Sequence, residues 1–203
     1  MVDEYERIIA ASLAAEDIPT EPDEDKFAEL LLLVAEELAG DRFGGIAKVN
    51  KVLFFAEFAH VRQTGRPITG VRYQKLPHGP APRPLRPIRD RLVASGAAEM
   101  TTETVLGREQ HRLRPLRPAD RSRFSDTELT AVKDAVAVLY GRTAREATDL
   151  SGEEPGWRIV DEGEDIPYAT AYLAPGDQRT SPRIQARARE IADDYARQGR
   201  PAR

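Results

Sequence analysis

The sequence predicts an α+β fold, made mainly of a helical bundle around one buried central helix, with a small antiparallel β-sheet formed by residues 71–76 and a hairpin at 98–115. Three observations predict it. Apolar residues recur at helical spacing in several segments. One of these segments, residues 45–62, is apolar around most of its circumference. Residues 98–105 and 109–115 are typical of two strands of a β-hairpin around Gly107.

The N-terminal part begins with a short predicted helix over residues 3–15, where Tyr5, Ile9 and Leu13 recur at helical spacing. Two prolines and six acidic residues in 16–25 then indicate a solvated linker. The next helix covers about 25–39. It can be capped by Asp23 or Asp25, and Gly40 fits its end.

The predicted helix at 45–62 is the most hydrophobic element of the chain. A helix that is apolar all round is a buried helix, so its few polar residues are informative. Asn50, Glu57 and His60 share one side at about 100° per residue. We expect these three side chains to be structural, satisfying backbone groups or each other beside the core. A Glu–His proton-transfer pair is the alternative.

Glycine and proline divide the middle of the chain. A turn at 65–67 precedes the strand at 71–76. Prolines 77, 80, 82, 84 and 87 forbid a helix through most of the following stretch. A helix starts near Pro84 or Pro87, since proline is tolerated in a first turn, and ends at Gly96.

Three further helices are predicted after the hairpin. One begins at Ser125 or Asp126 and runs to Tyr140, and a short one at 144–150 is capped by Thr143. An amphipathic C-terminal helix covers 182–197.

Composition argues against several kinds of site. The chain has no cysteine, and its three histidines lack metal-ligand spacing. No GxSxG and no phosphate-binding glycine motif occurs. We therefore expect no metal, no cofactor and no catalytic residue, and a binding protein rather than an enzyme.

The longest apolar run, 30–35, is far shorter than the ~20 residues of a membrane helix, and the N-terminus lacks a signal-peptide pattern. Both observations favour a cytoplasmic protein without membrane contact.

A nucleic-acid-binding alternative rests on arginine. The formal net charge of −4 makes nonspecific DNA binding a weak candidate. Residues 83–123 are nevertheless rich in arginine, and a helix followed by a hairpin has the order of a recognition helix and a wing, as in a winged-helix regulator. The side chains that would contact phosphates in such a regulator are Arg83, Arg86, Arg89, Arg91, Arg108, Arg112 and Arg114.

The run 49-VNKVLFFAEFAHVRQTGRPITGVRYQKLPHGPAP-82 resembles the Panacea domain, the SocA-like antitoxin family, which is also met in phage-associated GepA-like proteins. The family pattern is a helix of the type xNKLLYFAxxxHxxxxGxPI, a strand, and then xKxxxGPxP. The segment 150-LSGEEPGW-157 resembles the family's LSHxxxxW, with Gly152 at the place of the usual His, and His78 stands where an aromatic is commoner. The matching positions are Asn50, Lys51, Phe55, Ala56, His60, Gly65, Pro67, Ile68, Lys75, Gly79 and Pro80.

The resemblance implies an antitoxin of a toxin–antitoxin system, which neutralises a cognate protein toxin encoded nearby by direct protein–protein binding. It also permits an adaptor that delivers bound toxin to an AAA+ protease. We expect the antitoxin domain at 27–174, after an N-terminal helix and acidic linker at 1–26 and before an Arg-rich helical extension at 175–203.

The segment 73-YQKLPHGPAPRPL-85 holds most of the candidate binding residues. Pro77 and Pro80 fix φ on either side of a glycine that permits φ values other residues resist. Such a stiff turn displays a preorganised edge, which suits binding. The only tryptophan is expected to be partly buried with its edge beside this surface. The predicted partner-binding residues are Lys75, His78, Gly79, Pro80 and Trp157.

Overall fold

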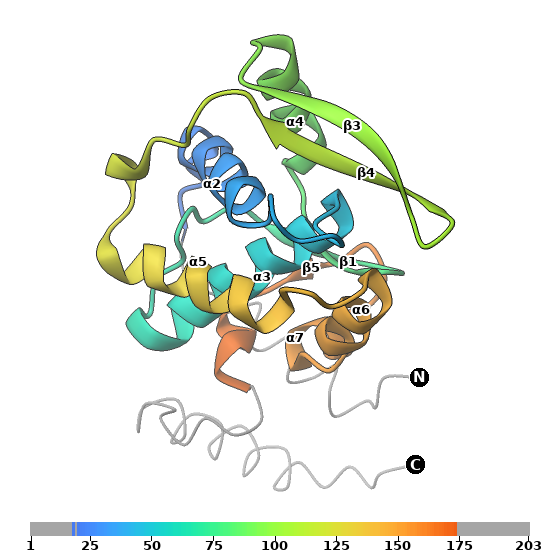
Figure 1. The fold of residues 1–203 in the computed structure, drawn as a ribbon. Coiled ribbons are helices and arrows are strands. Elements are labelled where there is room, and N and C mark those ends of the chain that lie inside the picture. Colours follow the sequence, from blue (N-terminus) through green and yellow to red (C-terminus); the bar gives the residue numbers. More distant parts are fainter. Residues whose placement is uncertain (1–17, 19, 174–203) are drawn as a thin grey trace, which may run out of the picture.

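The computed structural model describes Ile18 and residues 20–173, so the predicted helices at 3–15 and 182–197 lie outside the described residues. Figure 1 shows the helices gathered around α3 (Ile46–Thr64), with α2 (Glu24–Glu37) and α5 (Asp126–Leu139) packed against it. Small antiparallel sheets complete the molecule. The predicted α+β fold class is confirmed. Among the described residues, no helix combines the length and the apolar character that crossing a bilayer requires.

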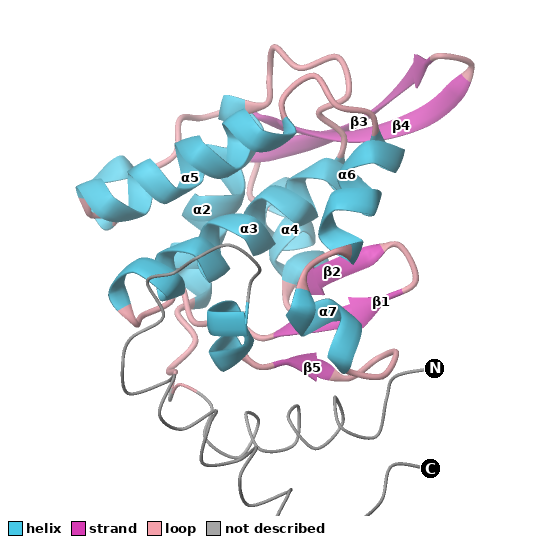
Figure 2. Cartoon of the chain, turned by 90° about the horizontal axis from the view of Figure 1, so that it is seen from below, coloured by secondary structure: helices cyan, strands magenta, loops and turns pink. Residues whose placement is uncertain are grey.

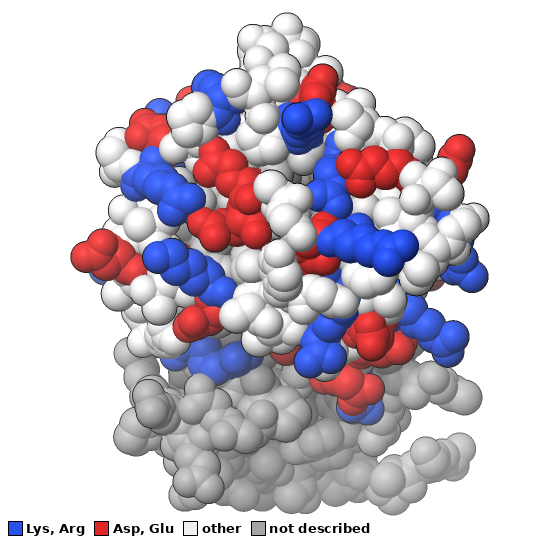
Figure 3. All heavy atoms as spheres, viewed as in Figure 1, with Lys and Arg blue, Asp and Glu red and all other residues white. Residues whose placement is uncertain are grey.

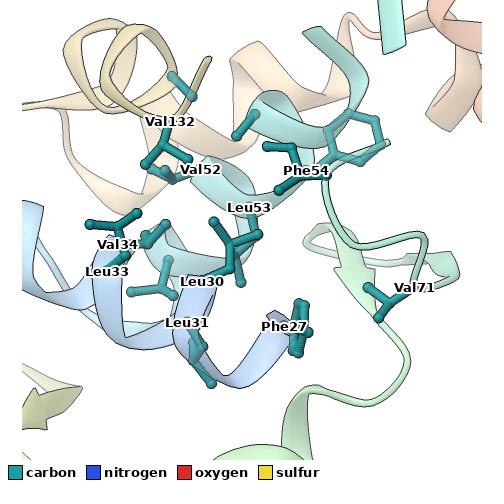
Figure 4. Packing of buried hydrophobic residues seen from close by; sticks show 14 of the residues in the cluster. Phe27, Leu30, Leu31, Leu33, Val34, Val52, Leu53, Phe54, Val71 and Val132 are labelled. Atoms are coloured by element: carbon teal, nitrogen blue, oxygen red, sulfur yellow. The ribbon is translucent and has the colours of Figure 1, made fainter. Parts of the chain in front are cut away.

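The core lies where α3 meets its neighbours. Val52, Leu53 and Phe54 are at most 1% exposed although they point in different directions from the helix. Figure 4 shows Leu30 and Leu33 of α2 packed near them. The prediction that residues 45–62 form a buried central helix is confirmed, because almost every side of α3 is covered.

In the part of the chain that the structure describes, two separate antiparallel sheets flank the helices (Figure 2). The first has the order β2–β1–β5, from β2 (Gly79–Pro82), β1 (Tyr73–Leu76) and β5 (Asp165–Ile166). The second is the hairpin of β3 (Ala98–Val105) and β4 (Arg108–Pro115). The remaining elements of the described residues are α4 (Leu85–Ala94), α6 (Ala144–Gly152), α7 (Pro155–Ile159) and two short 3-10 helices, η1 (Arg121–Arg123) and η2 (Tyr168–Leu173).

One expectation about the first sheet is wrong, and one of its strands was not predicted. The strand at 71–76 does not share a sheet with the hairpin, because β1 pairs with β2 and β5. The proline-rich stretch supplies a strand as well as a turn: Tyr73 lies opposite Pro82, and Lys75 opposite Pro80. Hydrogen-bonded pairs alternate along an antiparallel ladder, and both prolines occupy positions whose nitrogen faces away from β1. Their missing N–H groups therefore break no bond to β1, which makes proline acceptable in this edge strand.

Side chains fix the beginnings of three helices. Asp23 caps α2 by accepting a hydrogen bond from the Lys26 backbone nitrogen at 2.8 Å. Ser125 begins α5 and Thr143 begins α6, each within a capping box that a glutamate three residues later completes. Of the alternative caps expected from the sequence, Asp23 and Ser125 are the ones used.

A buried ion pair stabilises the connection between α2 and α3. The side chains of Asp41 and Lys48 are 1% and 0% exposed, and Lys48 Nζ donates to Asp41 Oδ2. Asp41 also accepts from the backbone nitrogens of Phe43 at 2.8 Å and Gly141 at 3.1 Å. Burial raises the pKa of Asp41, but the bonds from Lys48 and the two backbone N–H groups outweigh burial and hold it below its usual range. The carboxylate thus joins the α2–α3 loop to the end of α5.

The β3–β4 hairpin is fastened midway along β4 and projects at its turn. The guanidinium of Arg112 donates to the carbonyl oxygens of Ala39 at 3.1 Å and Asp41 at 2.6 Å, beyond the C-terminal end of α2. The turn lies at Leu106 and Gly107, between the paired residues Val105 and Arg108. In Figure 1 this turn extends away from the helices.

Candidate functional site

The turn between β1 and β2 rests on a buried lysine. Lys51 of α3 is 3% exposed, and its Nζ donates to the carbonyl oxygens of His78 at 2.9 Å and Ala47 at 3.3 Å. Burial lowers the pKa of Lys51 to about 8. Among the described residues, Lys51 has no ion pair with a carboxylate. The cation therefore holds the turn through backbone oxygen atoms alone.

Gly79 of β2 lies next to Lys51 of α3 and Ser151 of α6. Its φ is +113°, and a Cβ at this position would come within 2.8 Å of Ser151 Oγ and 3.3 Å of Lys51 Cε. Ser151 is fully buried and donates to the Thr148 carbonyl oxygen at 3.0 Å. Both the backbone conformation and the lack of space explain why glycine occupies this position.

Trp157 packs against the end of β1. Its Nε1 donates to the Leu76 carbonyl oxygen at 3.3 Å. Lys75 Nζ lies 4.5 Å from the centre of the indole ring and donates to the Val160 carbonyl oxygen at 2.9 Å. Trp157 and Lys75 are half-buried, whereas Leu76 and His78 are exposed. The tryptophan and the turn therefore form one continuous surface.

The structure brings all five predicted partner-binding residues together around one hairpin, but it divides them by exposure. Gly79 and Pro80 are buried and shape the turn, so they do not face a partner directly. We name the accessible part the β1–β2 surface and define it as Lys75, Leu76, Pro77, His78 and Trp157. Sequence reasoning gave Lys51 and Ser151 no role. The position of Lys51 within a helix that is apolar all round could have indicated a buried, functional lysine. No feature of the sequence indicated a role for Ser151.

Polar side chains of α3 fix the loop that leads into β1. Glu57 is fully buried and accepts from the backbone nitrogens of Ile68 at 2.6 Å and Thr69 at 3.0 Å, and from the Thr69 hydroxyl. His60 Nδ1 lies 2.6 Å from the Arg66 carbonyl oxygen. Glu57 and His60 thus bind separate backbone groups. Asn50 differs from the expectation for this set, because its Oδ1 is buried and has no hydrogen-bond partner within the described part of the chain.

The free energy of unfolding is expected to depend on Glu57 near neutral pH. Burial raises the pKa of Glu57 from 4.5 to about 7, against the hydrogen bonds from Thr69 and Ile68, which lower it. The folded protein then holds this proton more tightly than the unfolded chain. The resulting stability is fully present below pH 4.5 and is lost as the pH rises through 7.

A Glu57→Gln variant, which cannot ionise at this position, is the matched control. Urea unfolding should show the wild type losing roughly 2 kcal/mol between about pH 5.5 and 8.5 relative to this variant. Parallel pH profiles for the two proteins would contradict the assignment.

The arginines of the DNA-binding alternative are mostly engaged with acids. Figure 3 shows basic and acidic side chains interspersed over the face it presents, without a continuous basic stripe. Neutralised arginines contribute little to binding the phosphate backbone. The ion pairs are Arg83–Asp165, Arg89–Asp90, Arg91–Asp25, Arg112–Glu103 and Arg114–Glu99.

Comparisons with known proteins place the chain in a family. Neither a curated protein nor a solved structure matches it. The family model described as "Antitoxin SocA-like, Panacea domain" matches residues 49–158, which is more than half of the 203 residues. This range includes most of α3, both strands of the β1–β2 hairpin and Trp157. The chain therefore belongs to the SocA-like antitoxin family and carries its Panacea domain.

Proposed function

We propose that this protein is an antitoxin that neutralises a cognate protein toxin by binding it directly through the β1–β2 surface. The observation that carries the proposal is the contact between two segments far apart in the sequence. Trp157 donates to the Leu76 carbonyl oxygen, and Lys75 lies over the indole ring. Both segments lie within the range that the antitoxin family model matches.

The chemistry of the surface suits recognition of a protein. Tryptophan is enriched among the residues that dominate binding energy, because it combines a large apolar face with one donor. Here it stands beside Leu76, which is 37% exposed. The surface is also rigid: proline fixes φ at position 77, and Lys51 holds the His78 carbonyl oxygen. A rigid surface loses little conformational entropy on binding.

The described residues favour binding over catalysis. The His78 imidazole is exposed, and its backbone rather than its ring takes part in the hydrogen bonds around the turn. The buried groups nearby, Lys51 and Ser151, both donate to backbone carbonyl oxygens. Each is thereby committed to holding the turn and α6 in place.

Substitutions in the β1–β2 surface are expected to weaken toxin binding. The probe is the protein encoded by the reading frame adjacent to this gene, co-expressed for growth rescue and purified for calorimetry. Trp157→Ala and Leu76→Asp should each raise Kd by about thirtyfold, which corresponds to ~2 kcal/mol. His78→Phe is the exception and should bind like the wild type, because an aromatic residue is commoner at this position in the family that the chain resembles.

Matched controls separate binding from folding. Val138→Asp changes an apolar side chain that is 50% exposed on α5, outside the β1–β2 surface, and should leave Kd unchanged. Leu76→Asp should melt like the wild type, because Leu76 is partly solvated. Immunoblotting of the toxin distinguishes a blocked toxin, present at normal levels, from one delivered to a protease. Wild-type affinity in both Trp157→Ala and Leu76→Asp would sink the proposal.

A further inference from the structure

The turn of the β3–β4 hairpin holds a strained residue. Leu106 has φ +50°, and within the described residues it is the one non-glycine residue with positive φ. Gly107 follows with φ +75°. Two consecutive positive φ values define a type I′ turn, whose first position favours Asn, Asp or Gly. Leucine in this position is strained by contact between its Cβ and the backbone.

Leu106 is also exposed. Its side chain is 67% accessible, against 37–55% for the other exposed large apolar side chains in the part of the chain that the structure describes. A single exposed leucine is ordinary on a protein surface. An exposed leucine whose backbone has a conformation that leucine resists is unusual. A polar residue such as Asn would remove both the backbone strain and the exposed apolar side chain. Local strain of this kind concentrates at functional positions.

The turn is carried on a rigid arm. Eight cross-strand pairs fix the register of β3 against β4 up to Val105 and Arg108. Midway along β4, the carbonyl oxygens beyond α2 accept from the Arg112 guanidinium, and Gln110 Nε2 donates to the Arg42 carbonyl oxygen at 3.2 Å. The position of Leu106 relative to the core is therefore set by the fold.

The charge of the arm fits a protein partner rather than a nucleic acid. Over residues 98–115 the three acids, Glu99, Glu103 and Glu109, balance three arginines. Arg112 lies 3.3 Å from Glu103, and Arg114 lies 3.6 Å from Glu99. An arm without net charge whose tip is apolar is suited to an apolar pocket.

We propose that Leu106 is an anchor that enters an apolar pocket on the toxin, as a second contact beside the β1–β2 surface. Figures 1 and 2 show the β3–β4 turn and the β1–β2 turn projecting toward the same side of the molecule, so one partner can meet both. The inference rests on the proposed function for the identity of the partner, and it adds a contact that lies outside the β1–β2 surface.

The test is a substitution that separates stability from binding. Leu106→Asn creates the Asn-Gly turn that type I′ geometry favours. It should raise the melting temperature of the full chain by about 3 °C, while raising Kd for the protein of the adjacent reading frame about tenfold or more. Leu106→Met keeps an apolar anchor and should retain wild-type affinity. Leu116→Asn, at a side chain that is 55% exposed, should change neither quantity.

Each other outcome overturns the inference in a recognisable way. If Leu106→Asn raises the melting temperature and leaves Kd unchanged, Leu106 is not an anchor. If it lowers the melting temperature, Leu106 is not strained. If Leu106→Asn abolishes self-association in light scattering and leaves toxin binding intact, the pocket belongs to a second copy of the chain. If it abolishes duplex DNA binding instead, the arm is a wing. When Trp157→Ala weakens binding and Leu106→Asn does not, the inference fails and the proposed function stands.

Discussion

Gly79→Val is expected to destabilise the protein by about 4 kcal/mol and to abolish the proposed toxin neutralisation. Two effects add. A β-branched residue resists the φ of +113°. Its Cβ would also meet Ser151 Oγ at 2.8 Å, and to relieve that contact either the hydroxyl has to leave its hydrogen bond to Thr148 or α6 has to move. Urea unfolding measures the loss, and growth rescue measures the function.

Gly96→Val separates strain from crowding. Gly96 has a φ of +71°, but a Cβ there meets nothing within 4 Å. Only the backbone strain remains, about 1–2 kcal/mol. Equal losses at the two glycines would show that the contact between the β1–β2 turn and α6 is not tight, and the account of Gly79 would then be wrong.

Asp41→Ala is expected to be the second severe change, at about 3–5 kcal/mol. It leaves the Lys48 ammonium without its partner at a position where the side chain is 0% exposed. The backbone nitrogens of Phe43 and Gly141 lose their acceptor in the same step. The measurement is again the free energy of unfolding, at neutral pH.

The double variant Asp41→Ala, Lys48→Met tests the cause. Removing both charges takes away the uncompensated cation, so the double variant should be more stable than Asp41→Ala alone by about 2 kcal/mol. Methionine keeps an unbranched apolar chain, so a double variant that is less stable than the single one would mean that the Lys48 ammonium contributes without Asp41, for example over the Phe43 ring 5.7 Å away.

The helices could be predicted because their signals are local. The apolar period of α3, the capping serine of α5 and the threonine before α6 are all readable within a few residues. Strand β2 could not be predicted in the same way. Proline signals a turn in a sequence, and it becomes acceptable in a strand only when the pairing with β1 directs its nitrogen away from the ladder.

The sequence predicted the segments that form the candidate site, but it did not predict how they contact one another. The resemblance to the antitoxin family singled out both the 75–80 segment and Trp157, but the hydrogen bond between Trp157 and Leu76 spans 81 positions. No periodicity or spacing encodes such a contact. The same holds for Lys51, whose bond to the His78 carbonyl oxygen depends on how α3 packs under β2. The burial of Gly79 and Pro80 could not be predicted from the sequence either, because it depends on which residues pack around them in the fold.

The pairing of β1 with β5 has a consequence for the order of events during translation. The backbone nitrogen of Lys75 donates to the Glu164 carbonyl oxygen at 3.0 Å, and the Gly163 nitrogen donates back to the Lys75 carbonyl oxygen at 2.8 Å. The N-terminal part of a nascent chain emerges first. Lys75, which lies over the Trp157 ring, therefore cannot form its backbone hydrogen bonds to β5 until residues almost ninety positions later have been synthesised. A nascent chain that stops before residue 163 leaves the ribosome with β1 unpaired on that edge, so under the proposed function a prematurely ended chain should be unable to engage a toxin.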